Sequence, residues 1–492
     1  MSDATPPPVL EVERYGIEPI RREDQTSTPF DLFRITFGGA NTFATIILGT
    51  LPIAFGLSFW AAASATVVGV VVGGLVLAPM ALFGPRNHTN NAVSSGAHFG
   101  VRGRIVGSFL SLLTAIAFFS ISVWVSGDAI VGAAQRLLDI SGGNVLRAVA
   151  YGVIALAVLA VCIYGYQFML AVNKVAVIAA TVMMLLGVVA YASSFSFSFP
   201  GTGTYVLGSF WPTWMLAVLT VVSNPISFGA FLGDWGRYIP DTYRPVQLMA
   251  APFLAQLATL VPFLFGVATA TLVADPANYI GGLAAISPLW YAIPLMIVAL
   301  VGGMSTGVTS LYGTGLDFSS IFPRLSRVQA TVLIGTLAVL FIFIGNFVFN
   351  IVQSINAFAV LIVICTSPWM VIMMIGWLVR RGWYSPDDLQ VFNRGQRGGL
   401  YWFAAGLNWR GLAAWIPATI VGLCLANTPL IAGPLRNIAG GIDLSLVVTM
   451  VLAGVIYLVL LFVSPERRGV FGPDGPRFVP ASDRPTEPIT AG

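Results

Sequence analysis

The stretch Phe37-Gly38-Gly39-Ala40-Asn41-Thr42 interrupts an apolar segment with two glycines and an asparagine. A second apolar segment, at the matching place in the other half of the chain, contains Ser223-Asn224-Pro225-Ile226-Ser227-Phe228-Gly229. A membrane helix can leave backbone N–H and C=O groups unpaired only where it lines a cavity or is buried in protein, because lipid cannot satisfy them. Paired interruptions are typical of secondary transporters and mark the central binding site. The sequence therefore predicts two broken helices around such a site.

The composition indicates an integral membrane protein. The chain is 57% hydrophobic and 9% charged, with a mean hydropathy of +0.86, whereas soluble domains carry about 25% charged residues. Its 492 residues can hold about a dozen spans of roughly 20 residues each. No apolar run precedes Phe30, so we expect no cleaved signal peptide. The two histidines, His88 and His98, share one polar loop, which makes a metal-centred enzyme improbable.

The apolar runs predict twelve spans, which fall at about residues 34–57, 60–84, 104–136, 147–168, 171–193, 210–233, 245–273, 288–315, 328–348, 350–379, 410–430 and 439–463. The tails, 1–33 and 464–492, are rich in proline and charge, and we expect them to be disordered. The polar loop 85–103 is expected either to pack against the bundle or to be a solvated linker.

The arginines predict the orientation in the membrane. Connections expected on the side of the N-terminus carry most of them, and the opposite side holds little more than Arg136, Arg147 and Arg436. Since arginine and lysine concentrate in cytoplasmic loops, both termini are predicted to be cytoplasmic, in the cell membrane, with an even number of spans. The net charge of +4 is thereby explained by topology, and we expect a lipid bilayer and no nucleic acid as partner.

The interrupted segments are spans 1 and 6, which are five spans apart in the sequence. Residues 34–193 and 210–379 are therefore predicted to form two five-helix repeats, and an odd number of spans inverts the second copy. Residues 380–409 are predicted to form a cytoplasmic loop, and residues 410–463 to form two added helices. The predicted fold class is an all-α membrane protein of the five-plus-five inverted-repeat type, and we expect a monomer.

Several short motifs, in this order and spacing, resemble nucleobase:cation symporter family 1. This family includes bacterial cytosine permease, hydantoin transporters and fungal purine–cytosine permeases. The motifs are Gly56-Leu57-Ser58-Phe59, Phe83-Gly84-Pro85-Arg86, His98-Phe99-Gly100-Val101-Arg102-Gly103, Gly233-Asp234-Trp235-Gly236-Arg237-Tyr238, Leu311-Tyr312-Gly313-Thr314-Gly315-Leu316, Tyr401-Trp402-Phe403 and Gly406-Leu407-Asn408-Trp409-Arg410. The resemblance covers about residues 30 to 465. It implies a leucine-transporter-type fold and symport of a flat heterocycle with Na⁺ or H⁺, without an organic cofactor.

The resemblance also implies an ion site. Na⁺ favours oxygen ligands from unwound helices and hydroxyls, and Asp128, Asp234, Asp275 and Asp317 all fall near span ends. By matching, the ligands are the Ser305 and Thr306 side chains and the Gly302 carbonyl, completed by the carbonyls of Gly39 and Thr42. The alternatives are that the hydroxyls bond back to their own helix, or that Asp128 or Asp234 carries a coupling proton.

A planar ring is held by aromatic faces and by hydrogen bonds to its edge. Span 3 contains Phe118 and Phe119, and by matching Phe118 stacks on the ligand. Asn224 either bonds the ring edge or caps a half-helix. Ser227 falls on a substrate-contacting serine of cytosine permease, and Phe228 beside it is a candidate pocket wall.

Three positions depart from cytosine permease, since Ala115, Pro225 and Gly302 stand where that protein has Gln, Phe and Asn. Because hydrogen bonds to a ring edge discriminate strongly, the expected substrate is a purine, a hydantoin or a vitamin-like pyrimidine rather than cytosine. A vitamin or osmolyte transporter on the same fold is the closest alternative. A channel and a membrane enzyme are less favoured, because no continuous polar pore and no acid–base pair is visible in the spans.

Overall fold

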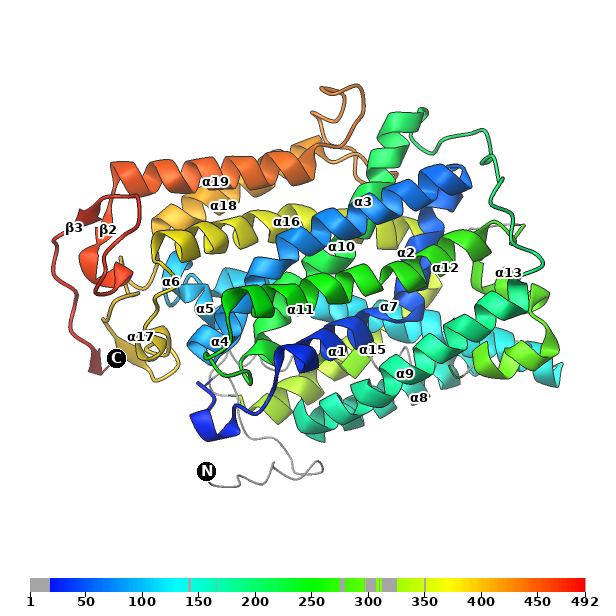
Figure 1. Ribbon diagram of the computed structural model, residues 1–492, viewed down its shortest axis with the longest axis horizontal. Helices are drawn as coiled ribbons and strands as arrows, with labels where there is room; N and C mark the ends of the chain where they lie inside the picture. Colours follow the sequence, from blue (N-terminus) through cyan, green and yellow to red (C-terminus); the bar gives the residue numbers. More distant parts are fainter. Residues whose placement is uncertain are drawn as a thin grey trace.

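The computed structural model describes residues 18–139, 143–164, 166–274, 279–295, 297, 307–308, 310–311, 325–348 and 351–491. Most of them are helical (Figure 1), which confirms the helical character expected from the sequence. The helices and strands are η1 (Arg22–Asp24), α1 (Pro29–Ala40), α2 (Phe43–Ala54), α3 (Phe59–Leu77), η2 (Ala78–Leu82), α4 (Phe83–Asn87), α5 (Asn91–Ser94), α6 (Gly96–Phe99), α7 (Ile105–Leu138), α8 (Asn144–Tyr164), α9 (Tyr166–Tyr191), α10 (Phe210–Gly236), α11 (Pro245–Ala258), α12 (Leu260–Ala270), α13 (Tyr279–Ile286), α15 (Arg327–Val348), α16 (Ile351–Val379), α17 (Pro386–Leu389), β1 (Gln396–Arg397), α18 (Trp409–Leu425), α19 (Ser445–Val463), β2 (Glu466–Arg467), η4 (Arg468–Phe471), β3 (Ala481–Ser482) and β4 (Thr490–Ala491).

Among the described residues, seven helices are long and apolar enough to cross a membrane, and the bent pair α1 and α2 makes an eighth. The outer faces of these helices are apolar. On α19, for example, Val447, Val451, Val455 and Val459 follow one another at four-residue spacing and are each between 51% and 58% exposed. Such a stripe suits contact with lipid tails. Most of the span predicted at 288–315 lies outside the described residues.

The first predicted interruption is confirmed. Helices α1 and α2 are bent by 55° at the break between them. Asn41 ends α1 and donates its N–H to the Phe37 carbonyl at 2.7 Å, while Thr42 adopts an extended conformation and begins α2.

The second predicted interruption is wrong, because α10 continues through Asn224 and Pro225 to Gly236. Pro225 removes one backbone donor, the one that would reach the Val221 carbonyl. The helix is supported from outside by α3, whose Gly69 and Gly73 lie against it. A methyl group added at Gly73 would lie 2.3 Å from Pro225 Cγ, and one at Gly69 would lie 2.7 Å from Val221 Cβ. This close packing of small residues keeps the proline within an unbroken helix.

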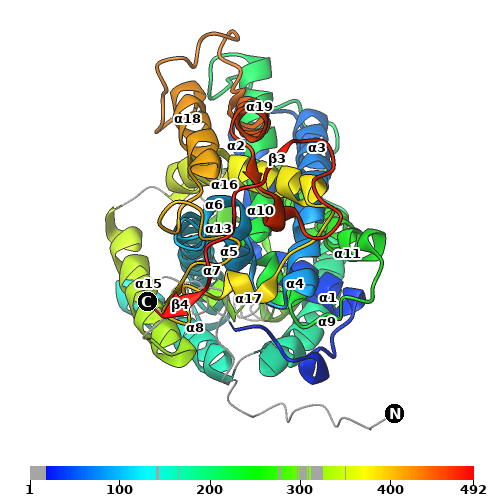
Figure 2. The same ribbon diagram turned by 90° about the vertical axis from the view of Figure 1, so that its left-hand side faces the viewer.

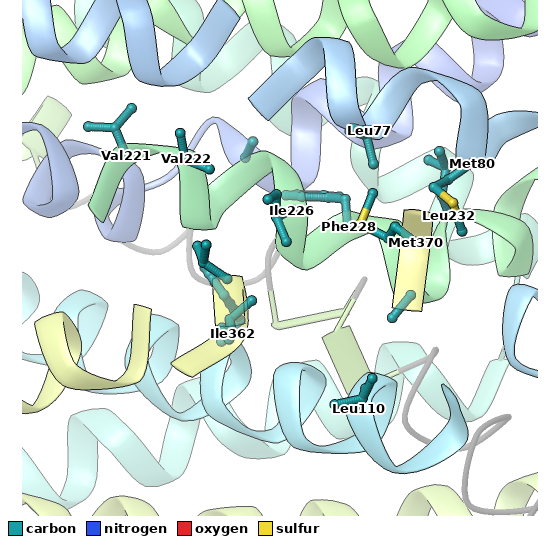
Figure 3. Close-up of a cluster of buried hydrophobic side chains, with 14 of the residues drawn as sticks. Leu77, Met80, Leu110, Val221, Val222, Ile226, Phe228, Leu232, Ile362 and Met370 are labelled. Atoms are coloured by element: carbon teal, nitrogen blue, oxygen red, sulfur yellow. The ribbon is translucent and has the colours of Figure 1, made fainter. Parts of the chain in front are cut away.

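Helix α10 lies at the centre of the hydrophobic core. Figure 3 shows Val221, Val222, Ile226, Phe228 and Leu232 of α10 among buried side chains from neighbouring elements. These neighbours are Leu77 of α3, Met80 of η2, Leu110 of α7, and Ile362 and Met370 of α16. The site described below is formed by helices that share this core.

The loop 85–103 packs against the bundle, so the alternative of a solvated linker is wrong. It folds into the short helices α4, α5 and α6, and Asn87, Asn91, Ser94 and His98 are all fully buried. The Asn91 amide donates to the Gly229 carbonyl of α10 at 2.9 Å and to the Met80 carbonyl at 3.2 Å. Since buried polar groups need partners, these bonds hold the loop to α10 and η2.

The prediction of disorder is wrong for the C-terminal tail. Strand β2 pairs in parallel with β3, and β1 pairs in antiparallel fashion with β4. Glu466 forms an ion pair with Arg380 at 2.8 Å, and both side chains are 1% exposed. Figure 2 shows this segment lying across the end of the bundle near α17. The N-terminal segment from residue 18 is also folded, since η1 precedes α1 and Ile20 donates its N–H to the His88 carbonyl at 2.9 Å.

Candidate functional site

The break between α1 and α2 offers several buried oxygen atoms. The Thr42 carbonyl accepts the Ile46 N–H at 3.1 Å and so starts the hydrogen-bond ladder of α2; its second lone pair stays available. Asn41 Oδ1 and Thr42 Oγ1 are buried and have no hydrogen-bond partner among the described residues. Gly39, the other predicted carbonyl ligand on this segment, is buried in the last turn of α1.

The remaining predicted ion ligands, Gly302, Ser305 and Thr306, lie outside the described residues. The two side-chain oxygens at the break were not singled out from the sequence. Their signal was present, because Asn41 and Thr42 are polar residues within an apolar segment. No group of three or more His, Cys, Asp and Glu side chains that could hold a metal ion occurs among the residues that the structure describes.

A hydrogen bond joins α10 to the start of α2. The Asn224 amide nitrogen donates to Thr45 Oγ1 at 3.1 Å, and the Thr45 hydroxyl donates to the Ala40 carbonyl at the end of α1. Asn224 Oδ1 is buried and lacks a partner in the described part of the chain. Because α10 does not break here, Asn224 is not the cap of a half-helix, and that alternative is wrong. Its side chain points across to α2 and keeps one free acceptor.

A small cavity lies beside this contact. It is lined by residues of α2, α7, α10 and α16, namely Ala44, Leu48, Phe118, Ile121, Ser223, Phe358 and Ala359. The volume open to a water-sized molecule is about 10 Å³, which leaves room for about one water molecule. The four helices therefore converge on a small, largely apolar cavity.

Two aromatic side chains contribute to this cavity, Phe118 from α7 and Phe358 from α16. The sequence singled out Phe118 and missed Phe358. Two residues before Phe358, Asn356 accepts a hydrogen bond from the Thr220 hydroxyl of α10 at 2.9 Å. Asn356 Nδ2 is buried without a partner among the described residues. An asparagine in the second turn of an otherwise largely apolar span was the signal for this second pair.

The other predicted substrate residues lie elsewhere or are already bonded. Phe119 is buried in the core, where a methyl group added at Gly307 would lie 3.4 Å from its ring. Phe228 packs edge-on against Trp235, with ring centroids 5.7 Å apart. Neither lines the cavity. The Ser227 hydroxyl donates to the Asn224 carbonyl at 2.5 Å, which leaves its oxygen free to accept.

Asp128, one of the two carboxylates considered for proton coupling, lies far along α7 from Phe118 and has local partners. The Tyr151 hydroxyl donates to Asp128 Oδ1 at 2.5 Å, and Arg147 Nε lies 3.4 Å from the same oxygen. These contacts favour a structural ion pair between α7 and α8.

Residues 19–449 match the family described as "Permease for cytosine/purines, uracil, thiamine, allantoin". The chain is similar to the putative purine-cytosine permease YxlA of Bacillus subtilis (strain 168), with 23% identity over 92% of this chain and 96% of that protein. It is also similar to the vitamin B6 transporter TPN1 of Saccharomyces cerevisiae, with 22% identity over 46% of this chain and 38% of that protein. A solved structure of similar fold is that of Mhp1, a nucleobase-cation-symport-1 family transporter, in a closed conformation with bromovinylhydantoin bound. The TM-score is 0.72, with 19% identity over 91% of this chain and 94% of Mhp1.

Proposed function

Because the chain belongs to the family of permeases for cytosine, purines, uracil, thiamine and allantoin, and is therefore a transporter and not an enzyme, we propose that it imports a planar heterocycle of the purine, pyrimidine or hydantoin type. Import is driven by symport of a cation, with alternating access around a central site. The convergence of Phe118 and Phe358 on one cavity carries this proposal, together with the unpaired amide atoms of Asn224 and Asn356, which are close in sequence to the lining residues Ser223 and Phe358.

The substrate ring lies against the Phe118 and Phe358 side chains, which offer aromatic faces from α7 and α16. Asn224 Oδ1 accepts from the ring edge, and Asn356 Nδ2 donates to it. Each of these atoms is buried without a partner among the described residues, and an unpaired buried polar group is costly. A substrate with a lactam or amidine edge removes this cost. Ser227 supplies a further acceptor.

At about 10 Å³, the cavity is too small for such a substrate. A heterocycle enters when α2, α7, α10 and α16 separate, and the helices close around it afterwards. Closure over an empty site leaves the asparagine groups unpaired, so bound substrate favours the closed form by its differential affinity. This is the energetic basis for alternating access at this site.

The coupling ion is Na⁺, bound by the carbonyls of Gly39, Thr42 and Gly302 and by the Ser305 and Thr306 hydroxyls. The unpartnered Thr42 Oγ1 and Asn41 Oδ1 at the break are additional oxygen ligands of the kind that Na⁺ favours. Ion binding joins the α1–α2 break to span 8. Proton coupling remains the alternative, through Asp234 or Asp128.

We further propose twelve spans in a five-plus-five inverted repeat with two added helices, both termini in the cytoplasm, and a monomer in the cell membrane. Support comes from the start of α1 and the C-terminal strands, which lie at the same end of the helices (Figures 1 and 2). An even number of membrane crossings places both ends of the chain on the same side of the membrane.

A second candidate substrate is a vitamin-like heterocycle, favoured by the similarity to a vitamin B6 transporter over part of the chain. The two candidates differ only in which groups meet Asn224 and Asn356, since both are flat rings with polar edges.

The test is thermal stabilisation of the purified protein by a panel of nucleobases, hydantoins and pyridoxine, in NaCl and in choline chloride. A ligand present at 100 times its Kd stabilises the folded state by about 2.7 kcal/mol. We expect one heterocycle to raise Tm, and the shift to grow in NaCl. In the variant S305A/T306A the heterocycle still raises Tm but NaCl adds nothing. A shift without a sodium effect in the wild type would support proton coupling, and the absence of any shift with nucleobases and hydantoins would reject them as substrates.

A further inference from the structure

A second cavity lies at the end of the bundle where α4, α11 and α16 meet, on the side of the membrane that we propose to be cytoplasmic. Its volume is about 250 Å³, and its wall includes Arg86 of α4, Asp241 and Tyr243 of the loop before α11, and Trp377 and Arg381 at the end of α16. It shares no residue with the cavity between α2, α7, α10 and α16. The proposed substrate site therefore does not account for it.

The charge of this cavity is positive and unbalanced. Among the residues that the structure describes, Arg86 and Arg381 make no ion pair, and Asp241 is the only acidic residue of the wall. Two guanidinium groups against one carboxylate leave a net charge of +1. Guanidinium groups bind phosphate oxygens in a bidentate manner, so an anion with several oxygens suits this cavity.

The backbone at Arg381 is unusual for an arginine. Its φ is +53°, in the left-handed region, and Gly382 follows at +71°. A residue with a side chain is disfavoured there by about 1 kcal/mol or more, and glycine or asparagine is the ordinary choice at such a helix end. A charged side chain held at this position, on the wall of a cavity, indicates a role for the guanidinium itself.

The aromatic part of the wall suits the interface between lipid and water. Trp377 packs edge-on against Phe83, with centroids 5.3 Å apart, and lies 5.7 Å from Tyr384, so its ring is held in place. Tryptophan and tyrosine favour the level of the lipid headgroups. Val246 and Leu378 directly follow the wall residues Pro245 and Trp377 in the sequence, and they are 70% and 49% exposed. Acyl chains can lie along these apolar side chains while a headgroup occupies the cavity.

We propose that this cavity binds the phosphate headgroup of an anionic phospholipid, with Arg86 and Arg381 on the phosphate oxygens and Trp377 and Tyr243 beside the glycerol. The first residue of α11, Pro245, also lines the cavity, so the positive end of that helix dipole adds to the attraction. Such a lipid joins the end of α16 to the start of α11. Asp241 repels the phosphate and sets a limit on the affinity.

The test measures the thermal stabilisation of the full chain in a neutral detergent during titration with dioctanoyl phosphatidylglycerol. The comparison ligands are dioctanoyl phosphatidylcholine, glycerol 3-phosphate and inorganic phosphate. The variant R86Q/R381Q removes the two cavity charges. The control R397Q/R468Q removes two exposed arginines of the loop and tail that have no ion pair among the described residues, and so changes the net charge equally.

We expect phosphatidylglycerol to stabilise the wild type and R397Q/R468Q at the same half-saturating concentration. In R86Q/R381Q this concentration rises by about fivefold for each arginine removed. The variant D241N shifts it in the opposite direction, which a folding defect cannot do. The proposal is overturned if R86Q/R381Q binds phosphatidylglycerol as well as the wild type does. It is also overturned if the half-saturating concentration in D241N equals that of the wild type. Equal stabilisation by phosphatidylcholine overturns the anionic selectivity, and saturation by inorganic phosphate at the same concentration assigns the site to a free anion instead.

Discussion

The Asn224 side chain lies 3.1 Å from the Thr45 hydroxyl, which in turn donates to the carbonyl of Ala40 at the break between α1 and α2. One amide therefore connects the unbroken helix α10 to the broken first span. The same amide keeps a buried oxygen without a partner among the described residues. Movement of α2 relative to α10 changes both the connection and the site that surrounds it.

Replacing Asn224 with alanine is expected to weaken substrate binding by about 5-fold to 150-fold, which corresponds to 1–3 kcal/mol for a lost buried hydrogen bond. The measurement is the Kd of the heterocycle that stabilises the wild type. The variant T45A serves as the matched control, because it breaks the contact to α2 and keeps the amide. Equal weakening in T45A and N224A would show that Asn224 acts by positioning α2 and does not contact the substrate.

Phe118 and Phe119 are adjacent in sequence, but only Phe118 lines the cavity. We expect F118L to raise the substrate Kd by about 2-fold to 10-fold, because a lost aromatic contact costs about 0.5–1.5 kcal/mol. We expect little change in Tm. In contrast, F119L is expected to lower Tm and to leave Kd unchanged, because this ring packs in the core. Binding and melting measurements on the two variants test the assignment, which fails if their effects are exchanged.

Gly73 of α3 is expected to tolerate no side chain. A methyl group there would lie 2.3 Å from Pro225 Cγ, whereas one at Gly152 of α8 has nothing within 4 Å among the described atoms. The variant G73L should therefore separate α3 from α10 and lower Tm by several degrees, since overpacking costs about 1–3 kcal/mol or more. The control G152L should melt like the wild type. A normal melting temperature for G73L would show that α3 and α10 do not pack this closely.

Stability is expected to fall as the pH falls below about 6.5, because of His98. Burial, together with the neighbouring Arg380 guanidinium, lowers the pKa of His98 well below its usual value. Arg380 Nη1 donates to His98 Nδ1 at 2.8 Å, so the neutral ring presents Nε2–H to the Tyr384 hydroxyl at 3.1 Å. Below the ordinary histidine pKa the unfolded chain binds a proton that the folded chain excludes, so the folded state loses up to about 1.4 kcal/mol per pH unit.

Tm of the purified protein at intervals between pH 7.5 and pH 5 measures this effect, and H98Q is the comparison. The pKa of His88 is also lowered by burial, so H98Q should keep a smaller slope of the same sign. An identical slope in H98Q and the wild type would mean that other groups carry the acid sensitivity.

The break in the first span could be predicted from the sequence because its cause is local. Two glycines, an asparagine and a threonine within an apolar run disfavour a continuous helix. The same local reasoning failed at Asn224 and Pro225. There the packing of α3 through Gly69 and Gly73 supports the helix, and these glycines lie about 150 residues away in the chain.

The C-terminal tail also shows that local sequence alone does not decide the structure, because this segment was predicted to be disordered and is folded. Its proline and charge content predicts disorder. In the structure, however, Glu466 forms an ion pair with Arg380 at the end of α16 and accepts a hydrogen bond from the Asn408 amide at 2.6 Å. A buried carboxylate is tolerated only with such partners. Composition cannot report a partner from another part of the chain.

Composition and the motifs by themselves determined that this chain is a helical membrane transporter with a bent first span, since every backbone group of a helix in lipid needs a hydrogen-bond partner. Only the tertiary structure decided which of two adjacent phenylalanines faces the cavity, that Phe358 lines the same cavity as Phe118, and that α10 remains whole. These outcomes depend on which helix faces meet, and the direction of a side chain around an apolar helix is set by its neighbours in space.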